Sequence, residues 1–149
     1  MKAASIFVFI SIALSACHRD PAERLIGHWR SNEPRTLAEF DRAKAAGRLT
    51  DWAAGREAIY RDGFFGRLEI LVEADRSKAW FPEDRPEDIP WGAHIIRDLG
   101  DDRFHWGTKE AKPGQPTHRI VQLQRDGQCY RIELPEMGFM EWFCRVASR

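Results

Sequence analysis

The sequence predicts a mainly β protein, an antiparallel eight-stranded up-and-down barrel that carries one early α-helix. From Ala58 onward, segments of five to ten residues with strand-like composition alternate with turn signals. Most of the connectors are hairpin-sized, so we expect successive strands to be antiparallel neighbours. Together with one strand near the start, eight strands are enough to close a sheet and remove its edges. The alternative is an open or sandwich-like β-sheet backed by the helix.

The first strand and the helix precede this region. Residues 25–31 alternate loosely between apolar and polar side chains and end at Asn32-Glu33-Pro34, which is a turn or cap signal. We expect a helix over residues 34–46, because Pro34 suits a first helical turn and Gly47 offers a stop. Its apolar residues recur at approximately helical spacing: Leu37, Phe40, Ala43 and Ala45. This narrow stripe suits a helix that lies against a sheet or at the mouth of a barrel.

Seven further strands follow. We expect them at residues 64–74, 77–82, 91–99, 102–108, 117–125, 128–134 and 139–147. Asp126-Gly127 is a strong two-residue hairpin signal, and residues 135–138 form a short connector. The longest connector is the acidic, proline-rich segment at residues 82–90. It is read first as a solvated loop, and alternatively as a rigid surface that docks a basic partner.

The start of the chain has the pattern of a secretory signal, with Lys2 before an apolar run from Ile6 to Leu14. A transmembrane helix is the alternative, but the run is far short of the roughly 20 residues that span a bilayer. Leu14-Ser15-Ala16-Cys17 resembles the lipobox of bacterial lipoproteins. This resemblance implies that residues 1–16 are removed and that Cys17 is lipidated. Residues 17–23 would then be a tether, and residues 24–149 a single β-barrel domain.

The resemblance also bears on location and partners. Lipoproteins with an aspartate directly after the cysteine tend to stay in the inner membrane, whereas His18 here implies the outer membrane and its periplasmic face. Asp20 keeps the inner membrane as the alternative. Removing 16 of 149 residues leaves 133, with 22 Lys and Arg facing 23 Asp and Glu. That balance argues against a nucleic-acid partner held by bulk charge.

Gly27-x-Trp29 in the first strand, followed by seven strands and a late Arg145, resembles the lipocalin-like, or calycin, pattern. The resemblance implies that Trp29 closes the floor of the barrel and that Arg145 packs across it. Stacking of a guanidinium on an indole contributes about 0.5 to 2 kcal/mol. The chain departs from the pattern at residues 33–57, where many calycins pass directly to their second strand.

The last two cysteines are expected to form a disulfide, since an exported compartment favours one; buried free thiols are the alternative. If residues 135–138 are a four-residue hairpin loop, Leu134 pairs with Phe139, and Cys129 then lies opposite Cys144. The same register directs Tyr130 and Glu141 to the other, interior face. Glu141 would be an inward carboxylate that needs a partner or a ligand.

Candidate binding residues are Trp91 and Trp106, which are next to loops, together with Tyr130 and Glu141. Most tryptophans in a small barrel fill its core instead. His94 and His105 would approach each other across a hairpin, but two ligands make only half a zinc site, so we expect no metal. With no G-x-S-x-G elbow and both remaining cysteines paired, we expect no enzyme and no cofactor.

Two functions of different class remain. The first is an outer-membrane lipoprotein whose lipocalin-like barrel binds a small, largely apolar ligand. The second is an envelope interaction or scaffold protein with a filled barrel, which acts on a partner protein through surface loops. An apolar cavity of about 300 Å³ that opens to solvent would favour the first, and a filled interior the second.

Overall fold

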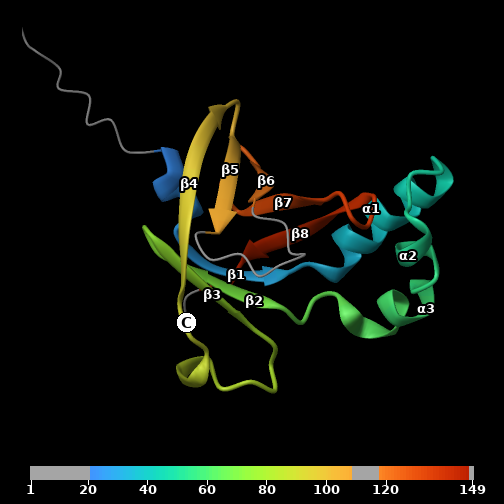
Figure 1. Cartoon of the computed structure of the whole chain (residues 1–149), viewed down its shortest axis with the longest axis horizontal. Helices are drawn as coiled ribbons and strands as arrows, with labels where there is room; N and C mark the ends of the chain where they lie inside the picture. Colours follow the sequence, from blue (N-terminus) through green and yellow to red (C-terminus); the bar gives the residue numbers. More distant parts are fainter. Residues whose placement is uncertain (1–20, 109–117, 148–149) are drawn as a thin grey trace, which may run out of the picture.

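The chain folds into a closed β-barrel with a group of short helices at one end (Figure 1). The computed structural model describes residues 21–108 and 118–147. The predicted signal segment, Cys17, His18 and Asp20 lie outside these described residues. The strands pair in sequence order from β1 to β8, and β8 pairs with β1 to close the barrel. All pairs are antiparallel, so the up-and-down barrel is confirmed and the open or sandwich-like sheet is wrong.

The strands agree with the predicted order and are shorter at most ends. They are β1 (Gly27–Ser31), β2 (Glu69–Val72), β3 (Arg76–Trp80), β4 (Gly92–Gly100), β5 (Arg103–Thr108), β6 (His118–Leu123), β7 (Cys129–Leu134) and β8 (Phe139–Arg145). The largest difference concerns the strand expected at residues 64–74, because residues Tyr60–Phe64 form the single helical turn η2. Gly63 leaves this turn with a φ of 77°, and β2 begins only at Glu69. Phe64 and Phe65 gave a strand-like pattern, but Phe65 packs in the core under the helices and Phe64 is exposed.

The predicted helix is present as α1 (Glu33–Ala45). Its start follows from local chemistry, since the Asn32 side chain accepts a hydrogen bond from the Arg35 N–H and Pro34 lies in the first turn. Two short helices, α2 (Asp51–Ala54) and α3 (Glu57–Ile59), continue into η2. One side of this helical group buries a second core against the start of β8, and its residues are Phe40, Ala43, Ala53, Tyr60, Phe65, Met137 and Phe139.

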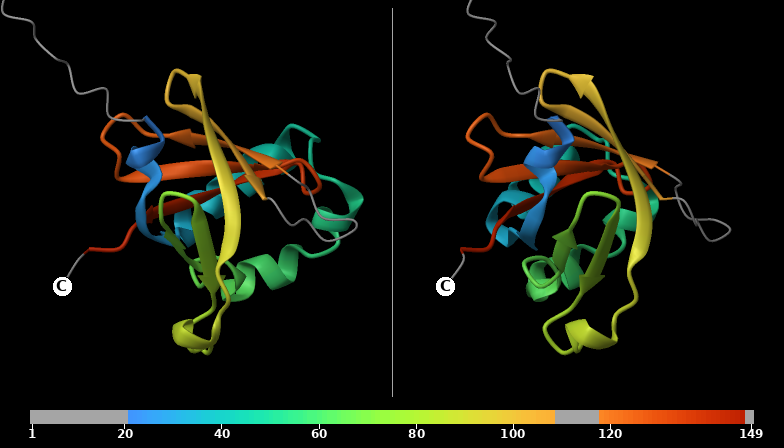
Figure 2. Two further views of the ribbon diagram at one scale, coloured as in Figure 1. Left: turned by 60° about the vertical axis from the view of Figure 1, so that its left-hand side comes forward. Right: turned by 90° about the vertical axis from the view of Figure 1, so that its left-hand side faces the viewer.

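The connections alternate between the two ends of the barrel (Figure 2). The helices, the β3–β4 loop and the β7–β8 turn lie at one end, which we call the mouth end. The tight β2–β3, β4–β5 and β6–β7 turns lie at the other, the floor end. The 3-10 helix η1 (Pro21–Leu25) leads into β1 there, and a second one, η3 (Pro86–Asp88), lies in the β3–β4 loop.

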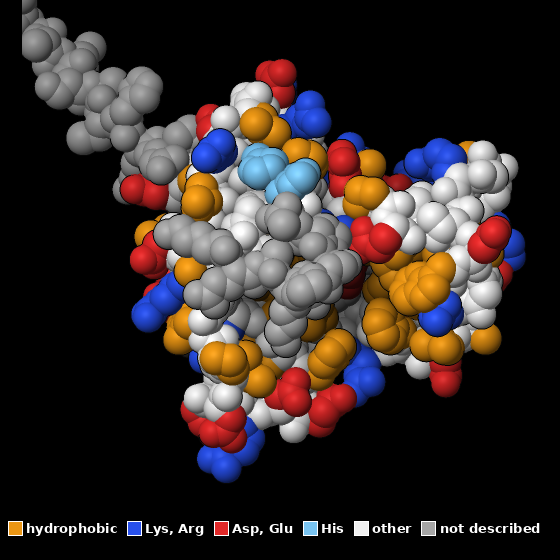
Figure 3. Space-filling model, viewed as in Figure 1, with side chains coloured by type: hydrophobic (Ala, Val, Ile, Leu, Met, Phe, Trp, Pro, Cys, Tyr) orange, Lys and Arg blue, Asp and Glu red, His pale blue; other side chains and the backbone are white. Residues whose placement is uncertain are grey.

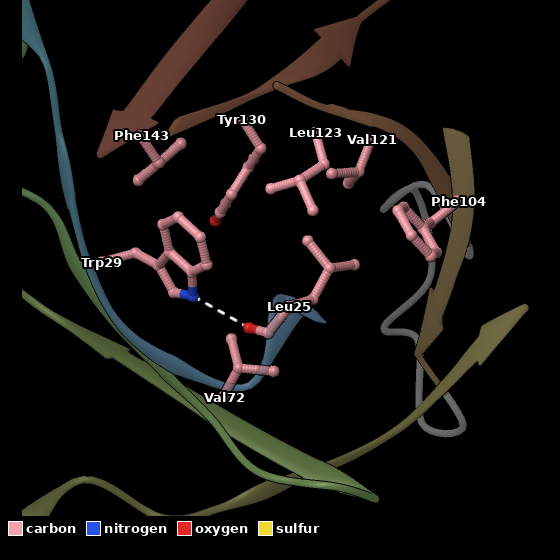
Figure 4. Packing of buried hydrophobic residues seen from close by; sticks show 8 residues of the cluster. All are labelled: Leu25, Trp29, Val72, Phe104, Val121, Leu123, Tyr130 and Phe143. Atoms are coloured by element: carbon pink, nitrogen blue, oxygen red, sulfur yellow. Dashed lines mark hydrogen bonds between the residues drawn. The ribbon is translucent and has the colours of Figure 1, made fainter. Parts of the chain in front are cut away.

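The floor is built around Trp29, which is fully buried (Figure 4). Its indole N–H donates to the Leu25 carbonyl at 2.9 Å, and the Arg145 guanidinium lies 4.2 Å from its ring centroid. This is the contact that the lipocalin-like resemblance implies. Arg145 also donates to the carbonyls of Arg24 (2.8 Å), Ile26 (3.0 Å) and Gly127 (2.9 Å). One side chain therefore joins η1, the residue between η1 and β1, and the β6–β7 turn.

Gly27 is required by the same contact. Its φ is 143°, which disfavours side chains, and a Cβ added there would clash with the Arg145 Nη1 atom. The G-x-W pattern thus has a direct structural reason: the glycine leaves space for the arginine that covers the tryptophan.

The last hairpin has the register that the sequence predicted. Leu134 pairs with Phe139 and Cys129 with Cys144, and the two cysteines form a disulfide. The pair lies on the outer side of the barrel, while Tyr130 and Phe143 stack inside it with ring centroids 5.3 Å apart.

We predict that the double variant Cys129→Ala, Cys144→Ala folds but loses about 3 kcal/mol of unfolding free energy, because the bridge closes a short loop in the unfolded chain. Urea denaturation of both proteins without reductant measures the difference. The parent protein denatured with reductant is the control and should match the variant. Recovery of two alkylated thiols from the unreduced parent protein would contradict the bridge itself.

Candidate functional site: the mouth of the barrel

The interior divides into a filled half and an accessible half. The floor half is packed by eight buried side chains: Leu25, Trp29, Val72, Phe104, Val121, Leu123, Tyr130 and Phe143. Toward the mouth, the inner wall is only partly buried, and its residues include Ile70, Ile96, Trp106 and Ile132. Any ligand inside this barrel therefore has access to the mouth half alone.

A pocket of about 190 Å³ opens in that half. The described residues that line it come from four strands: Ile70, Trp106, Thr108, His118, Arg119 and Ile132. Three of them form an apolar wall, and the polar ones lie where β5 ends and β6 begins. At this rim Arg119 forms a bidentate ion pair with Glu136, one contact being 2.6 Å, so its charge is already balanced.

A carboxyl group lies on the same inner face. Glu141 on β8 pairs with the pocket residue Ile132 on β7. Directly paired residues lie on the same face of a sheet, so the Glu141 side chain also points into the barrel. The Ser31 hydroxyl donates to Glu141 Oε1 at 2.6 Å, and the Gly66 N–H donates to the Ser31 oxygen at 3.1 Å. Ser31 is 4% exposed, so the hydroxyl group that donates to Glu141 is itself buried.

The protonation of this group differs from that of an ordinary carboxylate. Burial raises the pKa of Glu141 to about 7, and the hydrogen bond from Ser31 offsets only part of that effect. At neutral pH the side chain is therefore a mixture of carboxylic acid and carboxylate.

Tyr130 lies beside it in the interior. Burial first, and the negative charge of Glu141 second, raise the pKa of the phenol well above its usual value, so Tyr130 is neutral. Within the described residues its buried hydroxyl has no hydrogen-bond partner. The interior therefore contains one phenol that is able to donate and one carboxyl group that is able to accept or donate.

Three of the four predicted binding residues meet in the interior. Trp106 and Tyr130 have ring centroids 6.4 Å apart, and Glu141 acts on Tyr130 through its charge. Trp91 does not join them. It lies between the cations of Arg76 and Lys78, at 4.5 and 4.8 Å, on the outer side of β3. This position differs from the expected one at the mouth, because proximity to a loop does not fix which side of the sheet a residue just before a strand takes.

The expected approach of His94 and His105 is also wrong. The β4–β5 register pairs His94 with Thr108 and His105 with Arg97, so the two histidines lie on opposite faces of the sheet. His94 packs inside against Trp106 at 5.5 Å, and His105 lies outside next to His118 at 4.9 Å. Residues 21–108 and 118–147 contain no group of three or more side chains arranged to hold a metal ion.

Several site residues were not singled out from the sequence. The predicted register of the last hairpin also places Ile132 inside, and the alternation of β2 would have placed Ile70 there, but neither stands out by residue type. Ser31 was missed because its partner lies 110 residues away, across the seam that closes the barrel. No protein-family model, curated protein or solved structure matches the chain.

We predict that Glu141→Gln flattens part of the pH dependence of stability. Because the folded-state pKa is raised above its ordinary value of 4.5, the folded protein holds the proton more tightly, and stability falls as pH rises from about 4.5 to about 7. The parent protein loses up to about 3 kcal/mol of unfolding free energy over this pH window. The glutamine variant lacks that loss, so it should be more stable than the parent protein above pH 7.

Chemical denaturation of parent and variant across this pH window measures the effect. Glu83→Gln is the matched control, since its carboxylate is 58% exposed and lies on a surface loop. If the unfolding free energies of the parent protein and of Glu141→Gln fall in parallel between about pH 4.5 and about pH 7, Glu141 does not titrate in the predicted range.

Proposed function

We propose that this protein is a lipid-anchored lipoprotein of the bacterial outer membrane, on the periplasmic face, whose lipocalin-like barrel binds a small, largely apolar ligand in the mouth pocket. The observation that carries the proposal is the pocket itself, where Ile70, Trp106 and Ile132 form an accessible apolar wall inside a closed barrel. Exposed apolar surface of this kind costs free energy in water, and a ligand that covers it recovers part of that cost.

The volume limits the size of the ligand. The pocket has about 190 Å³, which falls short of the roughly 300 Å³ that we expected of a ligand-binding barrel and that typical drug-sized sites have. An engineered protein cavity of about 150 Å³ holds one benzene molecule. The ligand class we propose is therefore a single aromatic ring or a short alkyl chain, not a long fatty acid or a polycyclic cofactor.

The polar groups suggest one hydrogen-bonding end on that ligand. Arg119 at the rim is neutralised by Glu136, so the rim does not require an anion. Deeper in the barrel, Glu141 lies opposite the pocket residue Ile132 on the inner face, and we propose that its carboxyl group accepts from a hydroxyl or amine group of the ligand. A small phenol, alcohol or amine fits this combination of an apolar wall with one acceptor.

The anchor is inferred from the lipobox-like tetrapeptide that ends at Cys17. In residues 21–108 and 118–147, no helix is long and apolar enough to cross a membrane. The described chain enters the barrel at the floor end, through η1. A tether attached there would leave the mouth directed away from the bilayer and open to ligands from the periplasm.

A second candidate function is favoured by the packed floor half. Because eight buried side chains fill that half, the barrel is also suited to be a rigid scaffold for its loops. The β3–β4 loop is the strongest candidate contact. Its acidic residues Glu83, Glu87 and Asp88 are 58 to 65% exposed, and Lys78 anchors its backbone by donating to the Pro86 carbonyl at 2.7 Å.

We predict that single-ring probes bind the parent protein and that Ile132→Trp abolishes binding by filling the pocket. Toluene, p-cresol and benzylamine cover the apolar, phenol and amine classes. NMR shifts of the Trp106 indole N–H, with unfolding temperature as a second readout, report binding. Ile95→Trp is the matched control, because Ile95 lies on the outer face at 42% exposure. A folded parent protein that binds none of the probes would favour the scaffold function instead.

We predict that Cys17→Ser releases the protein from the membrane fraction of the producing bacterium, because the hydroxyl group of serine does not accept the lipid in a lipobox. Fractionation with immunodetection measures the distribution, and Ser15→Thr serves as a control that keeps the cysteine. A folded Cys17→Ser protein that stays with the membranes would show that the lipid anchor is absent or unnecessary.

A further inference from the structure

A second concave site lies on the outer side of the barrel, between α1 and the β6–β7 turn. Its volume is about 210 Å³, and its lining residues are Arg35, Ala38, Arg42, Gln124 and Trp142. Trp142 is on β8 but points outward, since Glu141 and Phe143 on either side of it point inward. This groove is therefore separate from the mouth pocket, with which it shares no lining residue.

The tryptophan of this groove is held firmly. Its backbone N–H donates to the Thr36 hydroxyl oxygen at 3.0 Å, and its indole N–H donates to Glu39 Oε1 at 3.1 Å. Its carbonyl accepts from the Asn32 N–H at 2.7 Å. Thr36 and Glu39 belong to α1, so the helix and the indole form one rigid unit. The Trp142 side chain stays partly accessible.

Positive charge is concentrated around the ring. The guanidinium carbon atoms of Arg35 and Arg131 lie 5.1 and 6.0 Å from the ring centroid. Arg42 and Arg131 both approach Glu39, at 2.9 and 3.9 Å. Two of the three arginines thus share the Glu39 carboxylate and Arg35 bonds the neutral Gln124, so the three arginines face one carboxylate and leave an excess of two positive charges.

The accessible part of this cluster is cationic. The Glu39 side chain is 12% exposed and already accepts from Trp142, whereas the Arg42 side chain is 64% exposed. Among the described residues, the Arg35 side chain makes one hydrogen bond, to Gln124 Oε1 at 3.0 Å, although a guanidinium has five N–H donors. A ligand that enters the groove therefore meets two guanidinium groups with free donors and an indole surface.

We propose that this groove binds an acidic saccharide. Its anionic group would pair with Arg35 and Arg42, which relieves the repulsion among the three arginines, and its ring would lie against the accessible part of Trp142. The volume suits one sugar ring and excludes an extended chain lying within the groove. The shared chemistry is an anion on a sugar ring, supplied either by a uronic acid or by a sugar phosphate.

The test follows the Trp142 indole N–H resonance in 15N-labelled protein, assigned by its loss in Trp142→Phe. Glucuronate and glucose 6-phosphate are titrated as the two anion classes, and neutral glucose and inorganic phosphate test the ring and the anion alone. We expect at least one acidic sugar to shift this resonance and to bind at least tenfold more tightly than glucose or inorganic phosphate. Which acidic sugar binds more tightly identifies the anion class.

The double variant Arg35→Gln, Arg42→Gln should weaken acidic-sugar binding about tenfold or more, since it removes both charged donors. Both residues are exposed, so the fold should be retained. Arg67→Gln, Arg85→Gln is the matched control, because these arginines are also exposed and lie on the β2 and β3–β4 side. The proposal is overturned if neither acidic sugar shifts the resonance up to tens of millimolar, if glucose or inorganic phosphate binds as tightly, or if the control pair weakens binding equally.

Discussion

The closure of the barrel depends on the contact between Arg145 and Trp29. Strand β8 must meet β1, which lies more than a hundred residues earlier, and the register joins them at only three residue pairs. Arg145 strengthens this short seam from below, because its guanidinium covers the indole while its N–H groups satisfy three carbonyls of the floor. Those carbonyls belong to turns and to η1, which have few partners of their own. The contact thus stabilises the floor end of the barrel, as additional backbone hydrogen bonds between β8 and β1 would stabilise its wall.

Within the described residues, the arrangement of the two clusters explains why the mouth half is less filled than the floor half. The floor cluster is complete around Trp29 and Tyr130, and the helical cluster is complete around Phe40 and Phe139. The second cluster lies over β8 and the β7–β8 turn, so it covers one side of the mouth and leaves Ile70, Trp106 and Ile132 beneath the other side. Figure 3 shows hydrophobic side chains gathered on the surface of the helical part as well, where Trp52, Ile59 and Phe64 are 42 to 56% exposed.

Much of the fold was predictable because its determinants are local. Turn signals in the sequence predicted the number of strands, and the four-residue loop at residues 135–138 predicted the register of the last hairpin. The alternation of side chains along each strand then placed Tyr130 and Glu141 inside. The site was less predictable, because it depends on pairs that are distant in sequence. Ser31 meets Glu141 across the seam, and Trp142 meets Glu39 through a helix whose position no local signal gives. The position of Trp91 was not predictable for a related reason, since its side of the sheet is set by its neighbours on β3.

The change from strand to helix at Asn32 has a consequence for the solubility of the protein. Beyond the Asn32 N–H, which donates to the Trp142 carbonyl, β1 stops accompanying β8, and the first half of β8 would be left with an unpaired edge. The Thr36 hydroxyl oxygen accepts the Trp142 N–H in place of a neighbouring strand, and α1 covers the remainder. An unpaired edge is a template on which another chain can add a strand. The early helix, which departs from the simple barrel pattern, therefore protects the protein from joining its copies edge to edge.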